Sequence, residues 1–247
     1  MEENEIKNEL KEDTNKTSAE IIAHKDNALK KLDALLLSYI SDKNTMDKTD
    51  KLSYWIEDFC NLLKAEKTFD PKFLKSYSRG DIIQVNLGYN IGNEEGGLHY
   101  CVVIDRHNSK KSGIVTVIPL TSDKGKKLDF SEVPLGNEVY SSFKKKYDVI
   151  MLKISKTINS FNEHTSREEI KSALETLDFL RKMDSKMEKM KKGSIALVSQ
   201  ITTISKQKIY DPQKTSDLLA EVRISDNSLD LINDKMKQLF IKNWKKI

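Results

Sequence analysis

The chain has 247 residues, of which 38% are hydrophobic and 32% are charged, with a formal net charge of +4. This composition supports a buried core under a strongly solvated surface, and the net charge is too small to indicate a polyanion partner by itself. No apolar run approaches the ~20 residues that span a bilayer, and the acidic, polar N-terminus does not have the pattern of a signal peptide. We therefore expect a cytoplasmic protein that does not contact a membrane.

The chain contains two cysteines, Cys60 and Cys101. Both lie among apolar residues, and neither has a partner at a spacing typical of a disulfide framework or a metal site. We expect both to be buried thiols of a protein in a reducing compartment.

The N-terminal quarter of the chain has the pattern of a helical hairpin. Residues 1–16 show no apolar periodicity and are expected to be frayed or disordered. Thr17 or Ser18 can cap a helix that runs to about Ser41, and a second helix is expected to end near Lys67. We expect the apolar faces of the two helices to pack on each other, and we assign residues 1–75 to an N-terminal extension.

A run of short strands follows the helical hairpin. Three apolar segments rich in Val and Ile cover 82–87, 101–104 and 114–120. A polar loop ending in Gly96 and Gly97 separates the first two, and a Lys/Ser/Asn turn separates the last two. Such runs are typical of a small antiparallel barrel. Residues 130–135 provide a further extended segment.

The strand pattern then gives way to a second helical hairpin. Apolar residues recur at helical spacing between Asn137 and Phe161, and Ser166 with Glu169 forms a capping box for the next helix. Gly193 is a natural helix stop. We assign residues 137–192 to a helical insertion, with the format of a short antiparallel coiled coil.

Strand character returns over 195–199 and 200–204. Asp211 and Pro212 predict the start of a short helix, and Ser225 or Asp226 predicts the start of a final helix. The predicted fold is thus α+β, with an antiparallel barrel in residues 76–247, two added helical hairpins and a C-terminal helix.

Several sequence blocks occur together in a recognisable order. Residues 79–122 contain RGDI, GNEEGG, VVI and PLTS, and residues 194–209 read SIALVSQITTISKQKI. Together they resemble the PemK/MazF family of toxin endoribonucleases. The resemblance implies an SH3-like barrel that forms a homodimer and cleaves single-stranded RNA, often mRNA, without a metal. It also implies a cognate antitoxin that blocks the RNA groove.

The resemblance also implies which residues of this chain form the site. The position where the family usually has a catalytic Arg holds His99, and the family's Thr falls on Thr121. An imidazole can act as acid, base or cation near neutral pH. We therefore assign catalysis to His99 and Thr121. The residues expected to contact the substrate are Glu94, Glu95, Gly96, Gly97, Tyr100, Ser122, Ser199 and Gln200.

A second interpretation stays open at this point. His99, Ser199 and Thr202 stand where the family often has charged residues, so the alternative is a catalytically impaired module that binds RNA or a protein partner. No His/Cys/Asp/Glu cluster has metal-ligand spacing and no Gly-rich phosphate loop is present. We expect neither a metal nor another cofactor.

Overall fold

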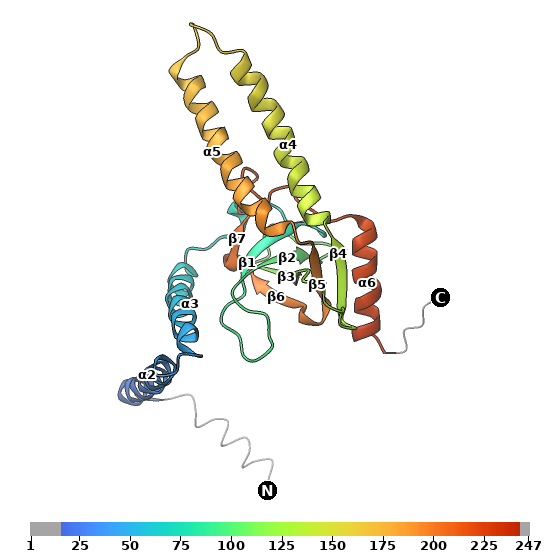
Figure 1. The fold of residues 1–247 in the computed structure, drawn as a ribbon. Coiled ribbons are helices and arrows are strands. Elements are labelled where there is room, and N and C mark those ends of the chain that lie inside the picture. Colours follow the sequence, from blue (N-terminus) through green and yellow to red (C-terminus); the bar gives the residue numbers. More distant parts are fainter. Residues whose placement is uncertain (1–15, 243–247) are drawn as a thin grey trace. The chain divides into compact units, whose positions relative to one another are not determined.

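The computed structural model describes residues 16–242, and the antiparallel sheet within them is the centre of the fold (Figure 1). The strands run in the order β4-β5-β3-β2-β1-β7, and β6 also pairs with β3. Every pairing is antiparallel. The predicted α+β class and antiparallel sheet are confirmed. The strands are β1 (Ile82–Asn86), β2 (Leu98–Val103), β3 (Ile114–Ser122), β4 (Glu132–Gly136), β5 (Ser194–Leu197), β6 (Thr202–Ser205) and β7 (Ile209–Asp211).

The central strands bury side chains on both faces of the sheet. Ile82 and Val102 belong to one hydrophobic core, whereas their neighbours Ile83 and Cys101 belong to another. Because successive side chains of a strand point to opposite faces, both cores draw on the same strands. This explains why the neighbouring residues Ile82 and Ile83 of β1 are both fully buried.

Three helices cover the first of these cores. Phe143 of α4 (Glu138–Asn159), Leu180 of α5 (Arg167–Met190) and Leu229 of α6 (Asp226–Phe240) are all buried there. The predicted starts of α5 and α6 are confirmed, since Ser166 forms the capping box with Glu169 and Ser225 caps α6.

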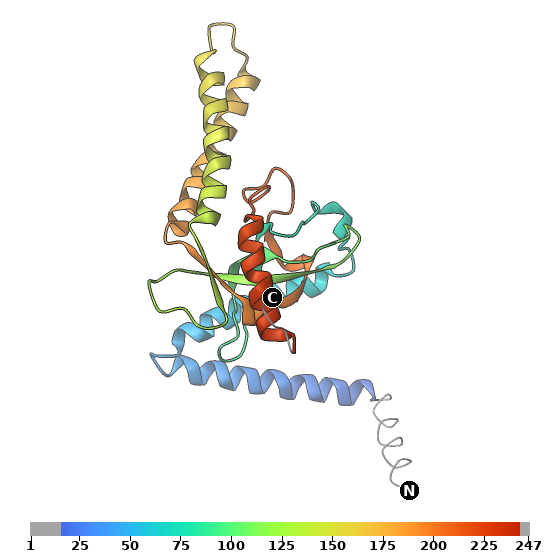
Figure 2. The same cartoon turned by 90° about the vertical axis from the view of Figure 1, so that its right-hand side faces the viewer.

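Helices α4 and α5 lie side by side and extend away from the sheet (Figures 1 and 2). Two lysines fix the base of this hairpin. Lys186 Nζ lies 2.5 Å from Asp211 Oδ2 and donates to Gln84 Oε1 at 3.0 Å. Lys146 Nζ donates at 2.8–3.1 Å to the carbonyl oxygens of Asp217, Leu218 and Ala220.

The N-terminal helices are α2 (Ser18–Ile40) and α3 (Met46–Ala65). Thr17 caps α2 as predicted, through a capping box with Glu20. However, neither helix buries a single side chain. The helices meet at their adjoining ends, where Thr49 Oγ1 donates to Leu36 O at 3.2 Å. Leu36 of α2 and Leu52 of α3 are half-buried, whereas Ile21 at the far end of α2 is exposed. The predicted packing of the apolar faces is therefore only partial.

The boundary between compact units falls inside α3. One unit comprises residues 1–58 and the other residues 59–247. The predicted frayed segment 1–16 lies outside the described residues except for Lys16. The domain boundary expected near residue 75 stays a prediction. A short 3-10 helix, Pro71–Phe73, lies in the segment that leads to β1.

Two local expectations are corrected. No helix begins after Asp211, because the Asp217 carboxylate, and not that of Asp211, accepts the amides of Gln213 and Lys214. The Asp211 carboxylate instead accepts from Leu219 N and from Lys186. The predicted strand from residue 200 begins only at Thr202, after the 3-10 turn Val198–Gln200.

The expectation that both cysteines are buried is wrong for Cys60, which is exposed, whereas Cys101 is buried. Cys60 lies one turn after the half-buried Ile56, in a part of α3 where Phe59 and Leu63 are also exposed. Among the described residues, no helix has the length and apolar character needed to span a membrane.

We expect Phe143→Ala to lower the free energy of unfolding by about 3–5 kcal/mol, because the ring is fully buried in the core under the helices. Val149→Ala is the matched control in the same helix. Val149 is 63% exposed, and its truncation should change stability by less than about 0.5 kcal/mol. Urea unfolding measures both. Equal effects of the two substitutions would contradict the placement of Phe143.

The two cysteines should react differently with iodoacetamide. Burial raises the pKa of the Cys101 thiol to about 12, so at pH 8 it is almost entirely the unreactive thiol form. Mass spectrometry of the native protein should find Cys60 alkylated and Cys101 unmodified. Both should react after unfolding in urea. Fast labelling of Cys101 in the native protein would show that β2 is not buried as described.

Candidate functional site

The loop between β1 and β2 is closed at its neck by two glycines. Gly97 N donates to Gly88 O at 2.6 Å, and Leu87 N donates to Gly97 O at 2.8 Å. Gly97 has a φ of +79°, which L side chains rarely adopt. A Cβ on Gly96 would lie 2.7 Å from Gly88 O. These glycines shape the loop.

Gln200 holds the same loop from the other half of the chain. Its Nε2 donates to Asn93 O at 3.0 Å, and its Oε1 accepts from Glu95 N at 3.4 Å. Inside the loop, Asn90 Nδ2 donates to Glu95 O at 2.6 Å. The 3-10 turn that ends at Gln200 aims its amide at the loop. Both polar atoms of one side chain thus fix the loop backbone.

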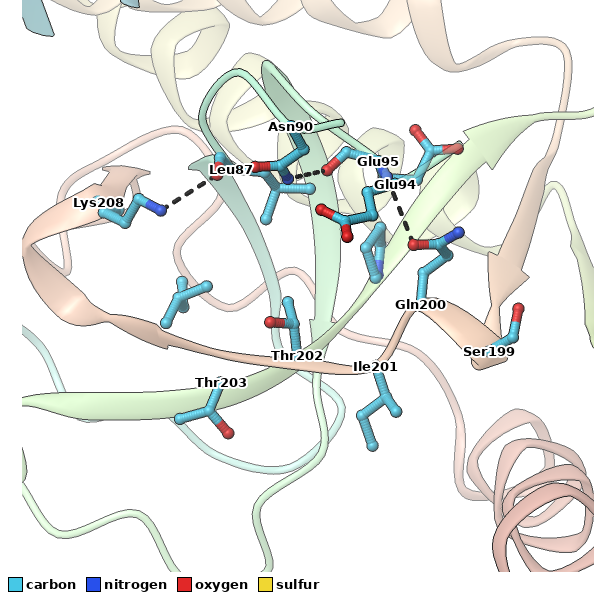
Figure 3. A pocket seen from close by; sticks show the side chains of 12 residues that line it. Leu87, Asn90, Glu94, Glu95, Ser199, Gln200, Ile201, Thr202, Thr203 and Lys208 are labelled. Atoms are coloured by element: carbon cyan, nitrogen blue, oxygen red, sulfur yellow. Dashed lines mark hydrogen bonds between the residues drawn. The ribbon is translucent and has the colours of Figure 1, made fainter. Parts of the chain in front are cut away.

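A polar pocket of about 420 Å³ lies between this loop and residues 199–204 (Figure 3). The Glu94 carboxylate points into it, and Lys208 lies at one end. Lys208 Nζ donates to Leu87 O at 3.1 Å, and burial lowers the pKa of its ammonium group. The pocket is lined by Leu87, Asn90, Glu94, Glu95, Pro119, Ser199, Gln200, Ile201, Thr202, Thr203, Ile204 and Lys208.

His99 lies next to this pocket and is joined to it through Glu95. His99 Nε2 is 3.3 Å from Glu95 Oε2, and its Nδ1 is 3.3 Å from Leu120 O. Both ring nitrogens therefore face oxygen acceptors, and both hydrogen bonds are made only when both nitrogens carry protons. The pair combines a carboxylate and an imidazole at the edge of a polar cavity.

Thr121 lies close to His99 in the sheet. The β2–β3 pairing ends at Cys101 and Pro119, each two residues from His99 and Thr121 along its strand. The contact of His99 Nδ1 with Leu120 O places the ring beside the backbone that precedes Thr121. The two residues predicted to be catalytic are thus brought together, although neither lines the pocket itself.

The predicted substrate contacts divide into three groups. Glu94, Glu95, Ser199 and Gln200 line the pocket. Gly96 and Gly97 shape the loop, and Ser122 pairs with Ser194 at the end of β3. Tyr100 lies on the face of β2 opposite His99 and packs against the helix-covered core, where burial raises the pKa of its phenol to about 12. A packed ring in this position does not offer its face to the pocket.

Sequence reasoning missed Lys208 and Asn90. Lys206 and Lys208 alternate in the segment that leads to β7, but Lys206 is buried and donates to Ser109 O at 3.0 Å. A spacing of two residues in an extended segment predicts the same side for both lysines, so it does not indicate that their environments differ. It also does not indicate which one reaches a pocket. Within residues 16–242, no group of three or more His, Cys, Asp or Glu side chains could hold a metal ion.

The fold and the pocket define an α+β protein in which a β1–β2 loop is held over a polar pocket beside a His–Glu pair. Residues 78–180 match the model of the PemK-like, MazF-like toxins of type II toxin–antitoxin systems. This part of the chain therefore belongs to the PemK/MazF-like family. The match ends inside α5, so residues 194–209, which also suggested the resemblance, lie outside it.

Two further comparisons concern solved structures and curated proteins. The chain is similar to a crystal structure of MazF (Form-I) from Deinococcus radiodurans, with 12% identity and a TM-score of 0.35, over 67% of this chain and 96% of that one. The family assignment does not depend on this weak similarity. No curated protein matches the sequence.

We expect Gln200→Ala to release the β1–β2 loop, because both hydrogen bonds that fix its backbone from outside are lost. Amides of residues 92–97 should exchange with deuterium about thirtyfold faster, which corresponds to about 1 kcal/mol for each of the two lost bonds. Thr202→Ala in the same pocket is the control, and its exchange in the loop should match the wild type. Unchanged exchange in Gln200→Ala would show that the loop is held by other contacts.

Proposed function

We propose that this protein is the toxin of a type II toxin–antitoxin system and a metal-independent endoribonuclease that cleaves single-stranded RNA. The observation that supports the proposal best is the His99–Glu95 pair beside the polar pocket. RNA cleavage by its own 2′-hydroxyl needs one group that accepts a proton and one that donates a proton. A carboxylate and an imidazole 3.3 Å apart supply both.

The proposed reaction needs no co-reactant besides RNA. Glu95 takes the proton of the ribose 2′-OH while the 2′-oxygen attacks the adjacent phosphorus. The bond from phosphorus to the 5′-oxygen then breaks, and the His99 imidazolium gives its proton to that oxygen. The products are a 2′,3′-cyclic phosphate and a 5′-OH end. The Nδ1 bond to Leu120 O orients the ring for this transfer.

Two further side chains have roles in the proposal. Thr121, close to His99, donates a hydrogen bond to a phosphate oxygen, where charge grows in the transition state. Lys208 supplies a cation at one end of the pocket, and a partly buried cation attracts the RNA backbone more strongly than one in bulk water. Glu94 and Gln200 then contact the bases of the bound strand.

The His at position 99 changes the electrostatics of the site relative to the Arg that is usual in the family. An arginine would carry a permanent charge and bind a phosphate with two parallel bonds. His99 carries a charge only when it is protonated, and here that charge faces Glu95. The cognate antitoxin and a homodimer belong to the same proposal.

His99→Ala should reduce RNA cleavage by at least about 100-fold, because it removes the proposed acid. His164→Ala is the matched control, since His164 is exposed in the turn between α4 and α5. Both are expressed in a bacterium, and RNA 5′ ends are mapped by primer extension. The wild type and His164→Ala should create the same discrete 5′-OH ends, and cleavage by the purified wild type should persist in EDTA.

Growth arrest without new RNA ends would contradict the endoribonuclease proposal. It would favour the alternative of a module that binds RNA or a protein without cutting it. The Ser and Thr at positions 199 and 202, where the family often has charged residues, support that alternative. New ends that persist in His99→Ala would place the chemistry elsewhere in the pocket.

A further inference from the structure

Helices α4 and α5 form an arm that is rigidly attached to the sheet at its base. Ile154 and Ala173 are buried between the helices, and Lys146 and Lys186 tie the base to the sheet and to the loop before α6. A partner bound along this arm would therefore be held in a fixed position relative to the rest of the 59–247 unit.

One flank of the arm is apolar and exposed. On α5, Ile170, Leu174 and Leu177 follow the spacing i, i+4, i+7, and Leu174 is 60% exposed. On α4, Met151 and Ile158 lie two turns apart and are also exposed. These five residues are called the arm patch below.

The two rows of the arm patch lie on the same side of the hairpin. Met151 comes one residue after the half-buried Ile150, and Leu174 comes one residue after the buried Ala173. Each step turns its helix by about 100° in the same sense. Because the helices are antiparallel and face each other, rotations in the same sense lead to the same flank (Figures 1 and 2).

The size of the arm patch fits a contact between proteins. Its five side chains expose about 400 Å² of apolar surface, and a standard interface buries about 800 Å² per partner, of which a little over half is apolar. Two such hairpins that pack along this flank would form a four-helix bundle, which is a common way for paired helices to bury an apolar stripe.

The charges at the ends of the patch indicate which partner fits. Arg167 and Asp178 are exposed on the same flank of α5, three turns apart, and they bracket Ile170 and Leu174. Neither makes a side-chain ion pair or hydrogen bond within the described part of the chain. Arg181, one turn after Leu177, is exposed on the same flank and adds a positive charge beyond Asp178. The opposite charges of Arg167 and Asp178 are still complementary to those of a second copy in the antiparallel direction.

We propose that the arm patch is an interface between two copies of this chain, which pack antiparallel about a two-fold axis that passes α5 between Ser172 and Ala173. Arg167 of each copy then pairs with Asp178 of the other. The apolar residues of both patches are buried between them. This interface is separate from the pocket and does not depend on the proposed enzymatic activity.

The oligomeric state of the full chain in solution tests this proposal. Sedimentation equilibrium should show that Leu174→Glu halves the number of chains in the assembly, from dimer to monomer or from tetramer to dimer. Val149→Glu is the matched control, because Val149 is 63% exposed on α4 outside the patch. It should assemble like the wild type. A monomeric wild type, or an assembly that Leu174→Glu leaves intact, would overturn the proposal.

A charge reversal tests the antiparallel arrangement. Arg167→Glu places like charges opposite each other and should weaken association by about tenfold or more. The double variant Arg167→Glu/Asp178→Arg restores opposite charges only where the two positions meet across the interface, and it should return the dissociation constant to within about threefold of the wild type. Both substitutions are at exposed sites, and circular dichroism checks that the helices remain. Failure of the double variant to recover would exclude this pairing.

Discussion

The structure depends on the two-sided burial of β1, β2 and β3. Ile82 and Ile83 are adjacent in the sequence but belong to different cores. A slip of one residue in the register would exchange the two faces of a strand and place each side chain in the wrong core. This constraint fixes where each strand ends. It therefore fixes the position of His99 at the start of β2, of Thr121 near the end of β3, and of the loop between β1 and β2.

The site is built from segments far apart in the sequence. Residues 90–95 and 199–208 form opposite sides of one pocket, and the helical arm is inserted between them in the chain. The insertion leaves the pocket intact because β4 and β5 are hydrogen-bonded neighbours, with Gly136 opposite Ser194. The chain thus leaves the sheet and returns to it at the same place.

Much of the fold could be predicted from the sequence, because the signals are local. Capping residues and helical spacing located α2, α5 and α6. The exposed faces of α2 and α3 could not be predicted, since periodicity indicates an apolar face and does not indicate what covers it. The prediction of a helix after Asp211 was wrong for a related reason. Asp211 has the residue type of a helix cap, but a lysine 25 residues earlier in the chain binds its carboxylate.

The sequence blocks that resemble the PemK/MazF family predicted part of the site. They indicated the loop, Gln200 and the position of His99, and the structure brings these together. They did not indicate the Gln200 clamp on the loop, the Glu95–His99 pair or Lys208. The Gln200 clamp and the Lys208 contact join segments more than 100 residues apart, about which sequence spacing carries no information. Glu95 and His99 are four residues apart, but their pairing depends on how the loop folds. Tyr100 shows the converse, since a residue next to His99 in the chain faces the other side of the sheet.

The outer half of the helical arm does not contribute to the buried core, whereas its base does. Residues 155–172 bury no side chain, whereas the base is held by lysines and by methionines in the core. Folding of the sheet therefore places no requirement on how long the arm is. Whole turns could be added to or removed from both helices during evolution without disturbing the pocket. The reach of the arm is then set by what it meets in solution and is independent of the stability of the fold.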